Sequence, residues 1–212
     1  MSIDPALIQD FSAAEFRRRA GRHALPPRCD DYGDHRLNPD LTEQIVRQGL
    51  RDAAVLVGVV DRGAQASVLL TKRTEAMRSH SGQIAFPGGR IDRDDLSPQA
   101  AALRETAEEV GIASESIELV GRLPDYVTGS GYRIVPVLGI IRPDYLLTIN
   151  ADEVDDAFEV PLSFLMNAAN HRRESRIWND RERFYYTMPF GDRFIWGVTA
   201  GIIRTLFERL YA

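Results

Sequence analysis

The pattern of apolar and polar positions changes near residue 50. Before it, residues 13–20 and residues 41–50 have helical spacing, and a segment rich in proline and glycine separates them. After it, apolar runs rich in β-branched residues are mixed with longer helical patterns. We therefore predict an N-terminal helical arm, residues 1–50, that packs on one main domain, residues 51–212.

The main domain is predicted to combine strands and helices. Its predicted strands are residues 53–60, 67–71, 117–123 and 134–141, of which the first two should form a hairpin. Its predicted helices are residues 98–110, 161–167 and 196–210. The last helix is amphipathic, and one face carries Trp196, Ala200, Ile203, Phe207 and Leu210. Because strands and helices do not alternate as regular βαβ units, the fold class we predict is α/β, with a mixed central sheet and helices on both sides.

The helix at residues 98–110 has clear signals at both ends. Ser97 can cap its start, Pro98 suits its first turn, and Gly111 can end it. These three residues fix where the helix begins and ends, and therefore which of its side chains are neighbours.

Three glutamates gather on one side of this helix. At about 100° per residue, Glu105, Glu108 and Glu109 are neighbours, and three apolar residues lie opposite: Leu103, Ala107 and Val110. We expect the apolar side to pack on the sheet and the three carboxylates to face outward. Like charges at this spacing repel, and the C-terminal end of a helix disfavours anions. A bound Mg²⁺ or Mn²⁺ would resolve the conflict, since both ions prefer oxygen ligands; a solvated acidic helix face is the alternative.

The residues around this helix favour the metal-binding interpretation. Arg104 lies beside Glu105 and four residues before Glu108, so it can hold a carboxylate in place. The pair Gly88 and Gly89 lets the backbone approach closely, and a carbonyl oxygen there could be a further ligand. An ordinary tight turn is the alternative for the two glycines.

The segment resembles the Nudix box, G-x5-E-x7-R-E-u-x-E-E-x-G-u with u aliphatic. Residues 104–112, Arg-Glu-Thr-Ala-Glu-Glu-Val-Gly-Ile, match its second half, except that Thr106 stands where an aliphatic residue is common. In the first half Asp95 replaces the usual glutamate, and eight residues rather than seven separate it from Arg104. This departure leaves the loop geometry and the role of Asp95 open.

The resemblance implies a Nudix-type α/β/α sandwich and an enzyme that hydrolyses a nucleoside diphosphate linked to another group. It also implies that Glu105, Glu108, Glu109 and the Gly89 carbonyl bind Mg²⁺ or Mn²⁺, and that Arg104 orients Glu105. We place both Arg104 and Glu105 in the catalytic set. The chemistry is sensible, because a divalent cation neutralises a pyrophosphate, orients it and lowers the pKa of attacking water.

A second segment, residues 69–89, is similar to the motif of the coenzyme A pyrophosphatase branch, L-L-T-x-R-[SA]-x3-R-x3-G-x3-F-P-G-G. The matching residues are Leu69, Leu70, Thr71, Arg73, Arg78, Gly82, Phe86, Pro87, Gly88 and Gly89, with Thr74 in place of serine or alanine. The resemblance implies cleavage of coenzyme A or its thioesters to 3′,5′-ADP and 4′-phosphopantetheine or its acyl form. Another nucleoside diphosphate derivative, such as NADH, ADP-ribose or a dinucleoside polyphosphate, is the first rival, and a Nudix fold that binds without catalysis is the second.

Several residues are candidates for holding this substrate: Arg73, Arg78, His80, Gly88 and Arg90, with Lys72 in addition. Arginine suits phosphate because its planar fork donates two hydrogen bonds. The alternatives are that Arg73 and Arg78 pair with Glu75 or with the loop at residues 92–95, and that His80 is simply solvated.

A water-activating base should come from another segment, because metal would occupy the glutamates of the helix. Glu153 is our candidate, and a surface acidic loop is the alternative, since Asp152, Asp155 and Asp156 lie nearby. Residues 171–186 mix cations with aromatic side chains, which could hold an adenine. For these residues we prefer an ordinary hairpin.

Composition narrows the class of function. The 212 residues carry a net charge of −5, which disfavours nucleic acid as a partner, and the nearby aspartates make Arg17 to Arg19 part of a mixed-charge surface. The single cysteine, Cys29, excludes a disulfide framework and a cysteine-based zinc site. No apolar run has the length of a membrane span, and the N-terminus lacks a secretory pattern. We therefore predict a cytoplasmic protein that acts on a small molecule, and the sequence leaves a homodimer open.

Overall fold

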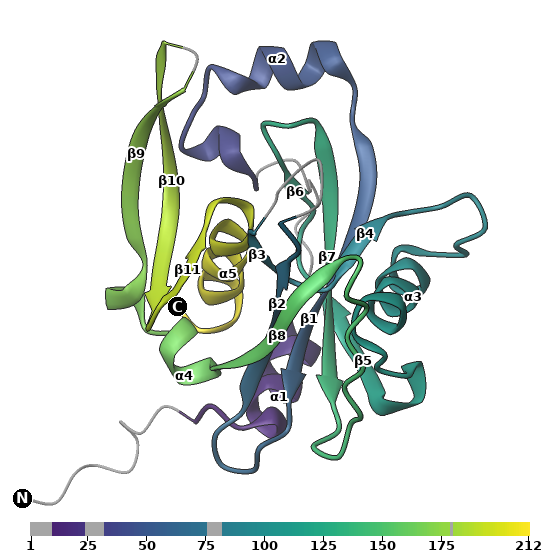
Figure 1. Cartoon of the computed structure of the whole chain (residues 1–212). Helices are drawn as coiled ribbons and strands as arrows, with labels where there is room; N and C mark the ends of the chain where they lie inside the picture. The colour runs from purple at the N-terminus through teal and green to yellow at the C-terminus, as the bar shows by residue number, and fades with distance from the viewer. Residues whose placement is uncertain (1–9, 24–31, 76–81, 179) are drawn as a thin grey trace, which may run out of the picture.

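The computed structural model describes residues 10–23, 32–75, 82–178 and 180–212 (Figure 1). Its helices are α1 (Ala13–Arg22), α2 (Leu41–Gln48), α3 (Pro98–Val110), α4 (Leu162–Leu165) and α5 (Gly197–Leu210), with short 3₁₀ helices η2 (Asp34–Arg36), η3 (Ser114–Ser116) and η4 (Ala168–Asn170). Its strands are β1 (Arg51–Val60), β2 (Ser67–Arg73), β3 (Ile84–Ala85), β4 (Gly88–Arg90), β5 (Ile117–Arg122), β6 (Tyr126–Val127), β7 (Tyr132–Ile141), β8 (Val154–Pro161), β9 (Arg172–Trp178), β10 (Arg181–Phe190) and β11 (Arg193–Trp196).

Eight of the described strands form a mixed central sheet, as the sequence predicted. Its main order is β3-β2-β1-β7-β5, with β4 paired to β1, β6 to β7 and β8 to β2. The pairing of β1 with β7 is parallel along ten residues, and the other pairings in this sheet are antiparallel. The predicted hairpin between β1 and β2 is confirmed, with Val60 opposite Ser67.

Helices cover both faces of this sheet, which gives the predicted α/β/α layers. Neighbouring residues of β1 point to opposite faces, so that Val57 belongs to a core shared with α1 and α5, while Leu56 belongs to a core shared with α3. In Figure 1, α3 lies on one side of the sheet, and α1 and α5 lie on the other. The two sets of helices therefore occupy separate environments.

The local signals at the helix ends were sufficient to place α3 and α1. The Ser97 hydroxyl accepts a hydrogen bond from Ala100 N at 3.1 Å, and Gly111 adopts the left-handed conformation, with φ of 70°, that ends α3. Ser12 caps α1 by accepting from Glu15 N at 3.2 Å, and this helix continues to Arg22. The predicted helix at residues 161–167 is shorter, because α4 ends at Leu165 and a 3₁₀ turn follows.

Helix α5 is buried on more than one face. Residues all round the helix are buried: Thr199, Ala200, Gly201, Ile202, Ile203, Thr205, Leu206 and Leu210. The reason is that α5 lies between the two sheets, with the Tyr126 ring pressed against Gly201 on one side and β10 and β11 on the other. The preferred hairpin at residues 171–186 is confirmed as β9 and β10, which stand beside α5 in Figure 1. No described helix has the length and apolar character that crossing a membrane requires.

Candidate active site

Helix α3 presents its glutamates differently from the sequence prediction. The expectation that all three carboxylates face outward is wrong for Glu109, whose residue is only 1% exposed, and Ala107 on the supposed packing side is exposed. The buried stripe consists of Ala101, Ala102, Thr106, Glu109 and Val110, so Val110 is buried as predicted. Thr106 fits this stripe because its hydroxyl donates to the Ala102 carbonyl at 2.6 Å, which leaves no unsatisfied polar group.

The buried carboxylate of Glu109 is held by two donors. Gly88 N donates to Oε2 at 3.2 Å, and the Arg73 guanidinium donates to Oε1 at 3.2 Å. The pKa of Glu109 rises to about 7, mainly because the carboxyl is buried and in part because Glu105 and Glu153 are negatively charged, while Gly88 and Arg73 act against the rise. Glu109 is therefore buried on the sheet side because it finds polar partners there.

Glu105 lies directly against the glycine loop. A Cβ placed on Gly89 would come within 2.5 Å of the Glu105 carboxylate, so only glycine fits at this position. Burial raises the pKa of Glu105, and repulsion from Glu108 and Glu153 adds to the shift. Glu108 is more accessible, since its side chain is 53% exposed.

Arg104 connects the loop to the carboxylates. Its Nε and Nη2 donate to the two carboxylate oxygens of Asp95 at 3.1 and 2.9 Å, and its Nη1 donates to Glu105 at 3.0 Å and to Glu108 at 2.9 Å. Its Nη2 also donates to the carbonyl of Arg90 at 3.2 Å. The Asp95 pairing lowers the pKa of that carboxyl. With eight residues between them, Asp95 and Arg104 thus form a two-pronged ion pair.

A loop far along the chain closes the end of α3. Thr148 N donates to the Val110 carbonyl at 2.9 Å, and Asn150 N donates to the Glu109 carbonyl at 3.0 Å, so this loop satisfies carbonyls that the helix end would leave open. Glu153 follows in the same loop, and its carbonyl accepts from Thr74 N at 3.0 Å. Its charge acts on both Glu105 and Glu109. Nothing local in the sequence indicated these backbone contacts.

The remaining candidates are placed as follows. Arg73 contacts Glu109, a partner that the sequence did not suggest. Gly88 adopts φ of 150°, and a Cβ there would collide with the backbone of β1 at Val55. Arg90 is exposed at the end of β4, while Arg78 and His80 lie outside the described residues.

The oxygen atoms gathered here fit a hard divalent cation. The Glu105, Glu108 and Glu109 carboxylates and the backbone of Gly89 are the donor types that Mg²⁺ and Mn²⁺ prefer. Within the described ranges no three acidic, histidine or cysteine side chains are already arranged around an ion position. The three glutamates are instead bonded to arginines: Arg104 donates to Glu105 and Glu108, and Arg73 donates to Glu109. Mutual repulsion among these carboxylates still favours a cation beside them.

Sequence comparison decides the family. Residues 49–181 match the family model described as NUDIX domain. The chain belongs to the NUDIX domain family. It is 43% identical over 169 residues to the uncharacterized Nudix hydrolase NudL of Escherichia coli (strain K12 / DH10B), covering 78% of this chain and 87% of that one. It is 42% identical over 178 residues to the uncharacterized Nudix hydrolase NudL of Cronobacter sakazakii, covering 80% and 87%.

Among solved structures, a binary complex of the C. elegans Ap4A hydrolase aligns with 57% of this chain and 86% of its own, at 21% identity and a TM-score of 0.46. The family and the curated relatives establish that this NUDIX protein is a hydrolase of phosphoanhydride bonds with a small-molecule diphosphate substrate. Enzymes of this family generally use divalent cations.

Proposed function

We propose that this NUDIX hydrolase cleaves the pyrophosphate of coenzyme A or its thioesters, with Mg²⁺ or Mn²⁺, to give 3′,5′-ADP and 4′-phosphopantetheine or its acyl form. The observation that carries the proposal is the contact between Arg73 and Glu109. Arg73 belongs to the segment that is similar to the coenzyme A pyrophosphatase motif, and Glu109 belongs to the Nudix box. Their 3.2 Å contact supports the proposal that the two motifs serve one site.

The residues that would hold the cation are Glu105, Glu108, Glu109 and the Gly89 carbonyl. A bound divalent cation would neutralise the diphosphate and increase the acidity of the attacking water. Arg104 would fix the orientation of Glu105 and Glu108 through its Nη1 donor, while Asp95 keeps the guanidinium itself in place. Arg104 is thus a positioning residue in this proposal.

Arg73 would recognise the substrate's phosphates. Its guanidinium lies at the buried end of the site, beside the carboxylate that we assign to the cation. A diphosphate bound at this site would meet the planar donor fork of the arginine. Gly88 and Arg90 belong to β4, beside the same site. Arg78 and His80 follow Arg73 in the segment that is similar to the coenzyme A pyrophosphatase motif.

Glu153 is the residue that we assign as general base. The bond from Thr74 N and the bond between Glu153 N and the Asn150 carbonyl fix its backbone. Its carboxylate is close enough to raise the pKa of Glu105 and of Glu109. Glu153 would accept a proton from the attacking water at this carboxylate, and its partial exposure gives that water access.

The deciding experiment is product analysis. The protein is incubated with coenzyme A and Mg²⁺ or Mn²⁺, and the products are separated by chromatography and weighed by mass spectrometry, with chelator as the control. We expect 3′,5′-ADP and 4′-phosphopantetheine in equal amounts. Next, kcat/KM is compared for coenzyme A, 3′-dephospho-coenzyme A, NADH, ADP-ribose and a dinucleoside polyphosphate. Equal values with and without the 3′-phosphate, or a clear preference for one of the other compounds, would contradict the assignment to coenzyme A.

A further inference from the structure

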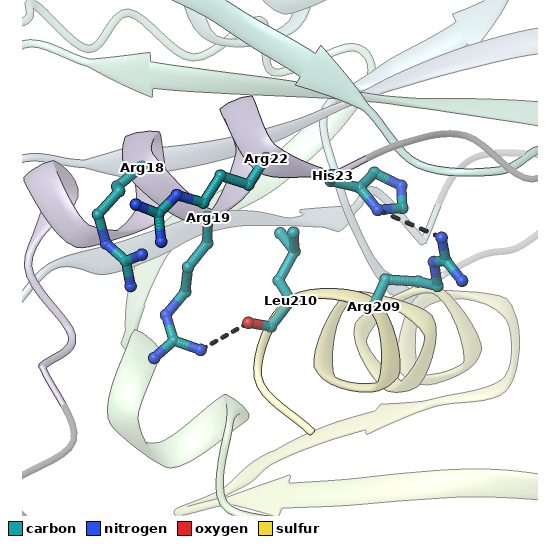
Figure 2. Close-up of a pocket in the computed structure, with 6 residues that line it drawn as sticks. All are labelled: Arg18, Arg19, Arg22, His23, Arg209 and Leu210. Carbon is teal, nitrogen blue, oxygen red and sulfur yellow. Dashed lines mark hydrogen bonds between the residues drawn. The ribbon is translucent and has the colours of Figure 1, made fainter.

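A cavity lined by basic side chains lies between the C-terminal ends of α1 and α5. Its volume is about 270 Å³, and six residues line it: Arg18, Arg19, Arg22, His23, Arg209 and Leu210 (Figure 2). Five of the six are basic and none is acidic. We call it the arginine cavity.

The arginine cavity is separate from the glutamates of α3. Phe16 of α1 and Ile203 of α5 belong to the core on one face of the central sheet, whereas Ala102 of α3 belongs to the core on the other face. A ligand in this cavity would therefore leave Glu105 and Glu109 untouched. The cavity contains two of the three consecutive arginines, Arg17 to Arg19, that the proposed hydrolysis does not use.

Among the described residues, the basic side chains at this cavity outnumber the acidic ones that act on them, Glu15 and Asp10. Glu15 accepts from Arg18 Nε and from Arg19 Nε, each at 2.6 Å, so one carboxylate is shared by two guanidinium groups. The hydrogen bond from Arg18, together with the one from Arg19, lowers the pKa of Glu15 to about 2, so the carboxylate stays ionised. Arg22 is exposed and has no ion pair or hydrogen bond with any described residue. Such a local excess is notable in a chain whose net charge is −5.

Helix capping explains only part of this cluster. Arg19 donates to the Leu210 carbonyl at 2.6 Å, and Arg209 lies in the last turn of α5, so both interact with the end of that helix. Arg18 and Arg22 do not interact with the end of α5. They lie one helical turn apart on α1, and in Figure 2 their side chains extend toward the same space, where like charges repel. A bound anion would convert this repulsion into attraction.

We propose that the arginine cavity binds a small phosphate-bearing anion. Guanidinium forks that converge from one helix match the oxygens of a phosphate or diphosphate group. A nucleic-acid backbone is the weaker fit, because the basic groups cluster at one open pocket instead of forming a long stripe and because the whole chain is acidic. The ligand would connect α1 to the end of α5.

The test measures binding of inorganic pyrophosphate to the full chain by calorimetry, with chelator present and with NaCl matched for ionic strength. Inorganic phosphate and ADP are titrated in parallel arms. The test variant is Arg18→Gln combined with Arg22→Gln. The matched control is Arg47→Gln. Like Arg18, which pairs with Glu15, Arg47 is an exposed helical arginine paired with a glutamate, Glu43. A second control, Arg73→Gln, removes an arginine of the proposed active site.

We expect one saturable site that the double variant weakens by about tenfold or more, while both single variants bind as the parent does. Tighter binding of ADP than of pyrophosphate identifies a nucleotide ligand, and equal binding identifies the phosphate group alone. Unchanged affinity in the double variant, no saturable binding by the parent, or loss of binding in Arg73→Gln would each overturn the proposal. If the double variant unfolds, Arg22→Ala is used, since that side chain has no described partner to lose.

Discussion

We expect Glu109 to destabilise the metal-free protein at neutral and higher pH. Its carboxyl pKa rises from 4.5 to about 7 on folding, mainly because the side chain is buried. This rise in pKa corresponds to roughly 3 kcal/mol. The folded state binds more protons than the unfolded state between these two pKa values, so stability is highest below about pH 4.5 and falls as pH rises through about 7.

The substitution Glu109→Gln removes this titration and keeps the shape of the side chain. In the presence of chelator, we expect the variant to exceed the parent in free energy of unfolding by roughly 2 to 3 kcal/mol near pH 8, and by under about 1 kcal/mol near pH 5. Urea unfolding followed by circular dichroism at both pH values measures the difference. Hydrolysis by the same variant should fall by orders of magnitude, so stability and activity would change in opposite directions.

The control is Glu108→Gln, on the same helix but with a half-exposed side chain. Its free energy of unfolding should change by less than about 1 kcal/mol at both pH values, because an exposed ion pair contributes little. Added Mn²⁺ should stabilise the parent more than Glu109→Gln if, as we propose, the cation binds the folded state through this carboxylate. If Glu109→Gln is no more stable than the parent near pH 8, or is destabilised equally at every pH, the reasoning from burial is refuted.

Three further substitutions test the rest of the site. Gly89→Ala should fold but lose cation affinity, because the added Cβ would meet the Glu105 carboxylate at 2.5 Å; a manganese titration by electron paramagnetic resonance measures it, and parental affinity would contradict the close approach. Arg104→Ala should lower cation affinity or turnover by about 10- to 100-fold, because two glutamates lose the donor that orients them; unchanged kinetics would remove its positioning role. Glu153→Gln should lower kcat by about 100-fold or more with cation affinity nearly unchanged, and a loss of cation binding with kcat preserved at saturation would make Glu153 a ligand instead of a base.

The sequence by itself determined the features that depend on neighbouring residues. Ser97 and Gly111 fixed the ends of α3, and the spacing of Glu105, Glu108 and Glu109 followed from the helical repeat. Capping and helical periodicity involve residues within a few positions of one another, so a single sequence contains all the information that they require. The strands β1 and β2 and their hairpin were predictable for the same reason.

Only the tertiary structure decided which sides of these elements are buried. Glu109 faces inward because Arg73, 36 residues earlier, and Gly88 provide donors there, and helical periodicity alone could not reveal those partners. The strand β8 was missed since its acidic residues interrupt the apolar pattern, and pairing with β2 stabilises it. Helix α5 is buried on several faces because two sheets enclose it. Burial is a property of both surfaces that meet, and these surfaces come from distant parts of the chain.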